Sequence, residues 1–123
     1  IAINPAKQFS QANNTKRRSD VSAILNAINQ YMADNKGTVP GGIPVSPASP
    51  AIISNTGADL CADLVPTYIA ALPVDPQTDD GTPVTSCAGA YDTSYDIVQS
   101  SSDSRITVSA PDAELTQTIE VTR

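Results

Sequence analysis

The amino-acid sequence predicts an α+β fold, in which one long N-terminal helix packs against a small antiparallel sheet of about three strands. Two observations support this prediction. Apolar residues recur at helical spacing in the first third of the chain, whereas alternating and β-branched segments occur only in its last third. The 123 residues are enough for one domain with a single modest core.

The helix is predicted from one apolar face. Its members fall at i, i+3, i+4, i+7, i+10 and i+11, namely Val21, Ile24, Leu25, Ile28, Tyr31 and Met32. No helix breaker follows Pro5, and Gly37 and Pro40 mark the other end, so the helix is expected from about residue 5 to 36. Such a helix is roughly 45 Å long, whereas a globule of this size has a radius of gyration of about 14 Å. We therefore expect residues 1–36 to form a shaft whose N-terminal part protrudes from a head, residues 37–123.

The start of the helix admits two interpretations. Asn4 and Pro5 suit the N-cap and the first position of a helix that begins there. They equally suit a proline kink inside a longer helix whose earlier part has been removed. The apolar residues Ile1, Ala2 and Ile3 favour the second interpretation, because exposed apolar side chains make a poor solvated terminus.

Residues 37–58 are rich in proline and glycine and are expected to form a loop. Four apolar residues are expected to pin this loop to the core: Ile43, Val45, Ile52 and Ile53. Residues 63–73 suit a short helix or turn with Pro66 near its start. The pair Asp80-Gly81 is a candidate tight turn.

Three strands are expected late in the chain, at residues 94–99, 105–110 and 115–123. A serine-rich segment joins the first two, which indicates a hairpin. The third alternates apolar residues with a threonine-rich face that suits solvent.

Composition excludes several classes of function. The chain has no histidine, which excludes histidine-based acid–base catalysis and histidine metal ligands. The G-x-S-x-G motif of serine hydrolases is also absent, so no enzyme activity is expected. The net charge of −6 argues against binding to a nucleic-acid backbone, which requires a basic surface.

The charge is unevenly distributed. Residues 1–36 hold five Lys or Arg and two Asp, a net of +3, whereas residues 37–123 hold two Arg and eleven acidic residues, a net of −9. This is either a solvated acidic surface or a basic shaft under an acidic head, which would favour contacts between copies.

Cys61 and Cys87 are the only cysteines. An even pair in turn-rich sequence favours a disulfide and an oxidising compartment over two unrelated buried thiols. In the chain-entropy model such a bridge stabilises the fold by roughly 3–4 kcal/mol.

The helix segment, followed by the ALPVDP turn and the strand YDIVQ, resembles the type IV pilin family, and the resemblance extends to the pseudopilins of type II secretion. Leu72, Pro73, Asp75 and Pro76 match the family's LP-x-DP turn. The resemblance implies a structural subunit of an extracellular filament used in adhesion, motility or DNA uptake. It also implies an apolar, membrane-spanning first half of the helix, which would be absent from this sequence.

The resemblance implies partners as well. Copies of the protein, minor pilins and the pilus assembly machinery would bind it, and the membrane would hold the missing N-terminal segment before assembly at the cell surface. Lys16, Arg17 and Arg18 would then lie where shaft meets head. They either solvate the shaft or pair with acidic heads of neighbouring copies, while Lys16 can also pair with Asp20 one turn away.

A calcium site is a further candidate. Asp75, Asp79 and Asp80 could supply oxygen ligands from a turn, with Asp92 or Asp96. Their spacing is not that of an EF-hand loop, and it favours solvated turn residues instead. No other cofactor is expected.

Two rival functions remain open. One is a type II secretion pseudopilin, which would assemble in the same way into a shorter periplasmic fibre. The other is a small secreted adhesin or binding domain, held by the cysteine bridge and without a role in assembly.

Overall fold

One long helix dominates the fold. The computed structural model describes residues 3–123. Helix α1 spans Pro5–Asp34. Asn4 is the N-cap: its backbone is extended, and its side chain accepts a hydrogen bond from the Lys7 amide, with Pro5 in the first helical turn. Of the two interpretations of Asn4 and Pro5, the described residues therefore show the N-cap. The favoured proline kink is not present in them, and Ile1 and Ala2 lie outside the described part.

The end of α1 follows the prediction closely. Asn35 is the C-cap, and its amide donates to the carbonyl groups of Tyr31 and Met32. Gly37 comes two residues later with a positive φ of 84° and donates to the carbonyl of Met32. The left-handed backbone that glycine adopts readily thus ends the helix.

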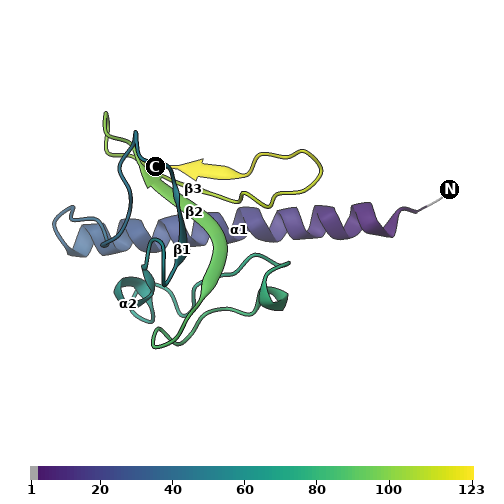
Figure 1. The fold of residues 1–123 in the computed structure, drawn as a ribbon, viewed down its shortest axis with the longest axis horizontal. Coiled ribbons are helices and arrows are strands. Elements are labelled where there is room, and N and C mark those ends of the chain that lie inside the picture. The colour runs from purple at the N-terminus through teal and green to yellow at the C-terminus, as the bar shows by residue number, and fades with distance from the viewer. Residues whose placement is uncertain (1–2) are drawn as a thin grey trace.

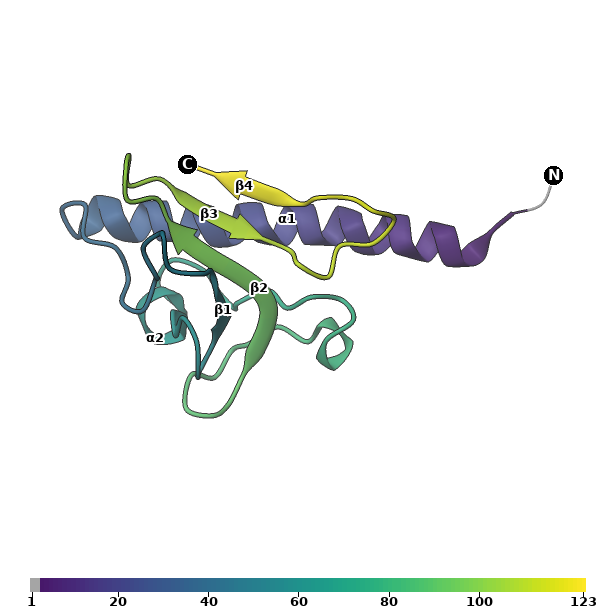
Figure 2. The same ribbon diagram turned by 45° about the horizontal axis from the view of Figure 1, so that its top comes forward.

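Four antiparallel strands form one sheet in the order β1-β2-β3-β4 (Figures 1 and 2). Their bounds are Ala51–Ser54 for β1, Asp92–Gln99 for β2, Ile106–Ser109 for β3 and Glu120–Thr122 for β4. The predicted serine-rich hairpin joins β2 to β3, with Gln99 opposite Ile106. The α+β class is confirmed, with one strand more than expected.

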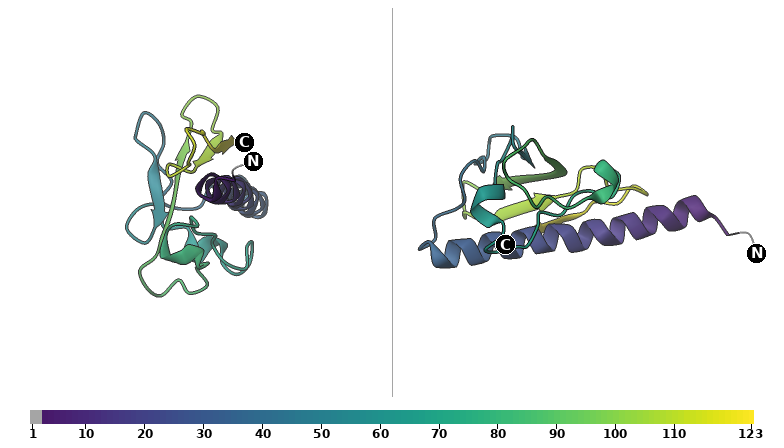
Figure 3. Two further views of the ribbon diagram at one scale, coloured as in Figure 1. Left: turned by 90° about the vertical axis from the view of Figure 1, so that its right-hand side faces the viewer. Right: turned by 90° about the horizontal axis from the view of Figure 1, so that it is seen from below.

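The sheet buries one face against α1. Alternate residues of β2 are buried, among them Tyr95 and Ile97, and Ile106 and Val108 of β3 join them. On the helix the predicted apolar face lies in the core: Val21, Ile24, Leu25 and Ile28 are fully buried, and Tyr31 and Met32 pack at its edge. Figure 3 shows the sheet and the loops on one side of α1.

Strand β1 was missed because it lies within residues 37–58, which the proline and glycine content assigned to a loop. Of the four apolar residues expected to pin this segment, Ile53 is fully buried and Ile43 partly so. Val45 and Ile52 are exposed, so their predicted role in the core is wrong. Pairing with β2 decides the conformation here, and local composition does not report that pairing.

The last predicted strand is much shorter than expected. The sequence predicts one strand over residues 115–123, but β4 covers only Glu120–Thr122. Ile119 and Arg123 at its ends add backbone hydrogen bonds to Ala110 and Ile106. Leu115 and Thr116 have positive φ values of 59° and 55°, and two such residues in succession interrupt the extended backbone of a regular strand. The segment from Pro111 to Ile119, here called the strap, instead runs along α1 towards its N-terminus before returning (Figure 2).

Two short helical elements complete the head. Helix α2 spans Cys61–Leu64, so it begins two residues before the segment predicted as a short helix or turn. A turn at residues 65–68 follows it, with Pro66 near its start as predicted. The 3-10 turn η1 at Asp79–Gly81 confirms a tight turn at Asp80-Gly81. Asp79 and Asp80 both have positive φ values there, as does Gly81.

Candidate functional site

The first turns of α1 project beyond the head. Residues 3–9 are all exposed, and the side chains of Ile3 and Phe9 are each 69% exposed. The head first reaches the helix at Ser10, whose hydroxyl donates to Glu114 of the strap at 2.9 Å. Figures 1 and 2 show this part of α1 extending past every other element. The predicted protruding shaft is therefore present in the described residues.

One ridge along this half of α1 carries no charge. Its members follow the helical spacing i, i+4, i+7 and i+11 and are all exposed: Gln8, Ala12, Thr15 and Ser19. A surface helix ordinarily presents charged residues on the face turned away from its core. An exposed ridge without charge, in which Ala12, Thr15 and Ser19 have short side chains, is instead suited to close packing against another helix.

Arg17 is the centre of the contact between helix and head. Its side chain is 0% exposed and forms a two-point ion pair with Asp75, at 2.7 Å from Nε to Oδ2 and 3.0 Å from Nη2 to Oδ1. It also donates to Asn14 at 3.0 Å, to Glu114 at 2.6 Å and to Gln77 at 2.9 Å. Burial opposes the positive charge, but the hydrogen bonds to Asp75 and Glu114 outweigh it and raise the pKa of Arg17.

The strap is attached to α1 through Asn14 and Glu114. The Asn14 side chain donates to the Glu114 carbonyl at 2.8 Å and accepts from the Glu114 amide at 2.9 Å. The Glu114 carboxylate accepts from Arg17, Asn13 and Ser10, and these hydrogen bonds lower its pKa. One residue of the strap thus meets four residues of the helix.

A second polar contact lies deeper under the sheet. The hydroxyl of Tyr95 on β2 donates to Asp20 Oδ2 at 2.6 Å, and Lys16 Nζ lies 2.6 Å from the same oxygen. Burial, followed by the hydrogen bond to Asp20, raises the pKa of Tyr95. Lys16 also donates to the carbonyl of Val74 at 3.0 Å. The predicted pairing of Lys16 with Asp20 is confirmed.

The basic triplet therefore has three different environments. Arg17 cannot meet an acidic head of another copy, because it has no exposed side-chain surface and its donors bind residues of its own chain. Its expected assembly role is wrong for that reason. Lys16 is engaged with Asp20 inside the molecule. Arg18 is exposed and donates to the side-chain oxygen of Gln117, while the Lys16 side chain is 42% exposed beside Asp20.

The candidate calcium ligands are not brought together. Asp75 is buried and directs both oxygens to Arg17, whereas Asp79 and Asp80 are exposed in η1. Among residues 3–123, no three acidic or cysteine side chains are grouped as a metal site would require. The reason is the pairing of Asp75 with a helix cation, which the turn sequence alone does not reveal.

The cysteine bridge is present as predicted. Cys61 and Cys87 are joined, with their Cα atoms 5.5 Å apart. Cys61 is buried in the core at the start of α2, whereas Cys87 lies in an exposed loop. The bridge fastens the turn-rich segment between η1 and β2 to the core.

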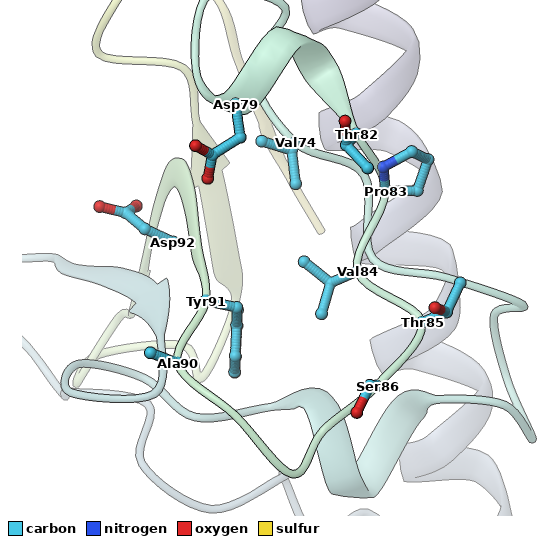
Figure 4. A pocket seen from close by; sticks show the side chains of 10 residues that line it. All are labelled: Val74, Asp79, Thr82, Pro83, Val84, Thr85, Ser86, Ala90, Tyr91 and Asp92. Carbon is cyan, nitrogen blue, oxygen red and sulfur yellow. The ribbon is translucent and has the colours of Figure 1, made fainter.

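A shallow cleft of about 290 Å³ opens beside this segment (Figure 4). Its lining combines an apolar wall with hydroxyl groups and two carboxylates: Val74, Asp79, Thr82, Pro83, Val84, Thr85, Ser86, Ala90, Tyr91 and Asp92. Asp79 and Asp92 lie on the same side of the cleft, and no cationic residue lines it.

Sequence reasoning missed Asn14, Glu114 and the buried pairing of Arg17. The available signal was spacing, since Ser10, Asn14 and Arg17 lie on the helix face that carries Val21 and Ile24. Polar residues on the core-facing side of a helix indicate that hydrogen-bond partners for them lie in the head. The identity of those partners depends on the strap, whose course the sequence did not predict.

Comparison with known proteins gave no match. The chain matches no protein-family model, no curated protein and no solved structure. Within residues 3–123, no helix combines the length and apolar character that crossing a membrane requires.

Proposed function

We propose that this protein is a structural subunit of a type IV pilus-like extracellular filament, and that its copies assemble through α1. The observation that supports the proposal most is the uncovered first part of that helix. A helix of 30 residues extends beyond a head that first contacts it at Ser10, and it leaves Ile3 and Phe9 in water. Burial of such side chains against another copy would stabilise an assembly.

The firm attachment of head to helix supports the same function. Arg17, Asp75 and Glu114 join the two parts near the middle of α1. Force applied along a filament would then pass from helix to head through the ion pairs of Arg17. The cysteine bridge would hold the head together internally. The subunit itself needs no catalytic group for this role.

The proposal includes the partners and the location. Other copies, minor subunits and the assembly machinery bind the helix, and an apolar segment ahead of Ile1 anchors the subunit in the membrane before assembly. A pseudopilin of a secretion system would use the same contacts in a shorter periplasmic fibre. A free adhesin domain would have no use for the exposed helix, which makes it the less suited alternative.

Electron microscopy of the native host tests the proposal. Deletion of the gene should remove a class of surface filaments, and the restored gene should return them. Antibodies to the head should label these filaments along their length. Unchanged filaments in the deletion strain, together with free head domain in the medium, would overturn the proposal.

The codons ahead of Ile1 separate the alternatives. A short basic leader followed by an apolar helical segment agrees with a pilin or pseudopilin. A cleavable secretory signal that leaves nothing apolar behind would agree with the free binding domain. Labelled filaments outside the cell, rather than within the periplasm, distinguish the pilin from the pseudopilin.

A further inference from the structure

A polar groove follows α1 beside the strap. Its volume is about 330 Å³, and it is lined by Gln11, Asn14, Thr15, Arg18, Leu115 and Gln117. No carboxylate is among these residues. The Glu114 carboxylate, next in sequence to Leu115, is directed away to Ser10, Asn13 and Arg17.

One cation, Arg18, lines the groove, and a second, Lys7, lies one helical turn beyond Gln11. Four residues follow the helical spacing i, i+4, i+7 and i+11 and therefore lie on one side of α1: Lys7, Gln11, Asn14 and Arg18. Lys7 and Arg18 are both exposed, and neither has an ion-pair partner within the part of the chain that the structure describes. Eleven residues of helix separate them by roughly 16 Å. We call this surface, including Lys7, the basic groove.

The head carries a surface of opposite charge. Asp79 and Asp80 of η1 and Asp92 at the start of β2 are exposed, and none of them forms an ion pair among residues 3–123. Asp79 and Asp92 share the rim of the cleft in Figure 4. We call these three residues the acidic lip.

The acidic lip and the basic groove lie on different sides of α1. Gly81 of η1 approaches Lys16, since a Cβ built on it would lie 3.9 Å from Lys16 Cε. The strap and Arg18 lie on the other flank of the head-facing side of the helix, so that the strap appears above α1 and η1 below it in Figures 1 and 2. One copy cannot satisfy its own groove with its own lip.

We propose that the basic groove of one copy binds the acidic lip of another copy in the filament. The inference rests on the proposed function and specifies its contact. Opposite charges that are both left without an ion pair in one chain are complementary between two chains. Because groove and lip are different surfaces, the contact is heterologous and extends into an open assembly instead of closing a dimer. The amide groups of Gln11 and Gln117 supply further donors to incoming carboxylates.

Charge reversal and its rescue test the contact in the full-length protein in its native host. The double variant Lys7→Glu/Arg18→Glu should lower the filaments sheared from cells roughly tenfold, because two exposed ion pairs are replaced by repulsion. Adding Asp79→Lys/Asp80→Lys to the same chain should restore filaments. The matched control Lys36→Glu/Arg105→Glu makes the same change in net charge at two exposed positions elsewhere and should leave filament yield unchanged.

Cysteine pairs give a second measurement. A chain that carries Thr15→Cys in the groove and Thr82→Cys beside the lip, and is otherwise unaltered, should form covalent dimers and ladders in its filaments on mild oxidation. The control pair Thr15→Cys and Thr38→Cys, which is placed at the far end of α1, should not.

Each outcome decides between the two proposals. If the unaltered gene yields no labelled filaments, the proposed function fails. If filaments form and the reversal does not reduce them, the groove and lip contact is wrong. If the reversal reduces them and the exchanged charges do not restore them, the groove binds something other than the lip, with anionic lipid headgroups the next candidate.

Discussion

Arg17 and Asp75 form a two-point ion pair in which neither side chain has any solvent exposure. The two residues are 58 positions apart in sequence, and the pair joins the middle of α1 to the segment that precedes η1. A buried pair stabilises little compared with an apolar replacement of both partners, but removal of one partner leaves the other charge uncompensated. The pair is therefore a sensitive point for mutation.

Arg17→Met should lower the free energy of unfolding by about 3–5 kcal/mol, because Asp75 would remain buried without a counter-charge. Urea denaturation followed by circular dichroism measures the change. Arg18→Met, which alters an exposed neighbour, should cost less than about 0.5 kcal/mol. Addition of Asp75→Leu to Arg17→Met should recover part of the loss. Equal stability of the two single arginine variants would contradict the role given to Arg17.

Glu114 should stabilise the fold at neutral pH, and this contribution should be lost in acid. Hydrogen bonds from Arg17, Asn13 and Ser10 lower the pKa of its carboxyl group in the folded state. A lowered folded pKa means a contribution that is fully present above the unfolded value, near 4.5, and is lost as the pH falls through the folded value. The stability difference between the wild type and Glu114→Gln should be largest at neutral pH and should shrink in acid. A difference that does not depend on pH would contradict this assignment.

The helix and the β2–β3 hairpin could be predicted because their signals are local. The apolar positions of α1, from Val21 to Ile28, repeat at helical spacing, and all of them lie in the core. The disulfide and the protruding first turns also followed from the sequence, through cysteine count and helix length.

What could not be predicted depends on contacts between distant residues. Strand β1 exists because Ala51 and Ile52 pair with β2 some forty residues later, within a segment whose prolines and glycines indicate a loop. The strap departs from a strand at Leu115 and Thr116, and Glu114 is fixed by Asn14, 100 residues earlier. Spacing along one chain segment carries no information about such pairs.

Tyr95 should stabilise the fold through its hydroxyl group as well as through its buried ring. The hydroxyl donates to Asp20 in a buried site, and a hydrogen bond to a charged group contributes about 1.5–3 kcal/mol. Tyr95→Phe should lower the free energy of unfolding by that amount, as measured by urea denaturation. Tyr31→Phe is the matched control, because the described residues provide no hydrogen bond to the Tyr31 hydroxyl, and it should be nearly neutral.

Tyr95 should also affect how the stability of the fold changes at alkaline pH. Burial raises the pKa of Tyr95 in the folded state, so the unfolded chain ionises first, near its ordinary value of 10. Stability should therefore fall as the pH rises above about 10. Tyr95→Phe should lose less stability than the wild type over that range. An identical alkaline decline in both proteins would show that other tyrosines, such as Tyr91, are responsible.

The bridge between Cys61 and Cys87 should stabilise the head through its sequence separation of 26 residues. In the chain-entropy model a loop of this size contributes about 3.5 kcal/mol. Cys61→Ala/Cys87→Ala should unfold at correspondingly lower urea concentration. A reducing agent should destabilise the wild type by a similar amount and leave the double variant unchanged. An equal effect of the reductant on both proteins would contradict a structural role for the bridge.

A substitution of Phe9 can distinguish an effect on filament assembly from an effect on the stability of the monomer. Its side chain is 69% exposed, so Phe9→Gln should change the free energy of unfolding by less than about 0.5 kcal/mol. If a neighbouring copy buries the ring, the same change removes about 1.5–3 kcal/mol from each contact, which lowers association tenfold or more. Quantitative immunoblots of sheared filaments measure this loss. Val45→Gln, a matched change of an exposed apolar residue on the head, should leave filament yield unaltered. Equal yields from the two variants would mean that the projecting helix does not reach its neighbours through Phe9.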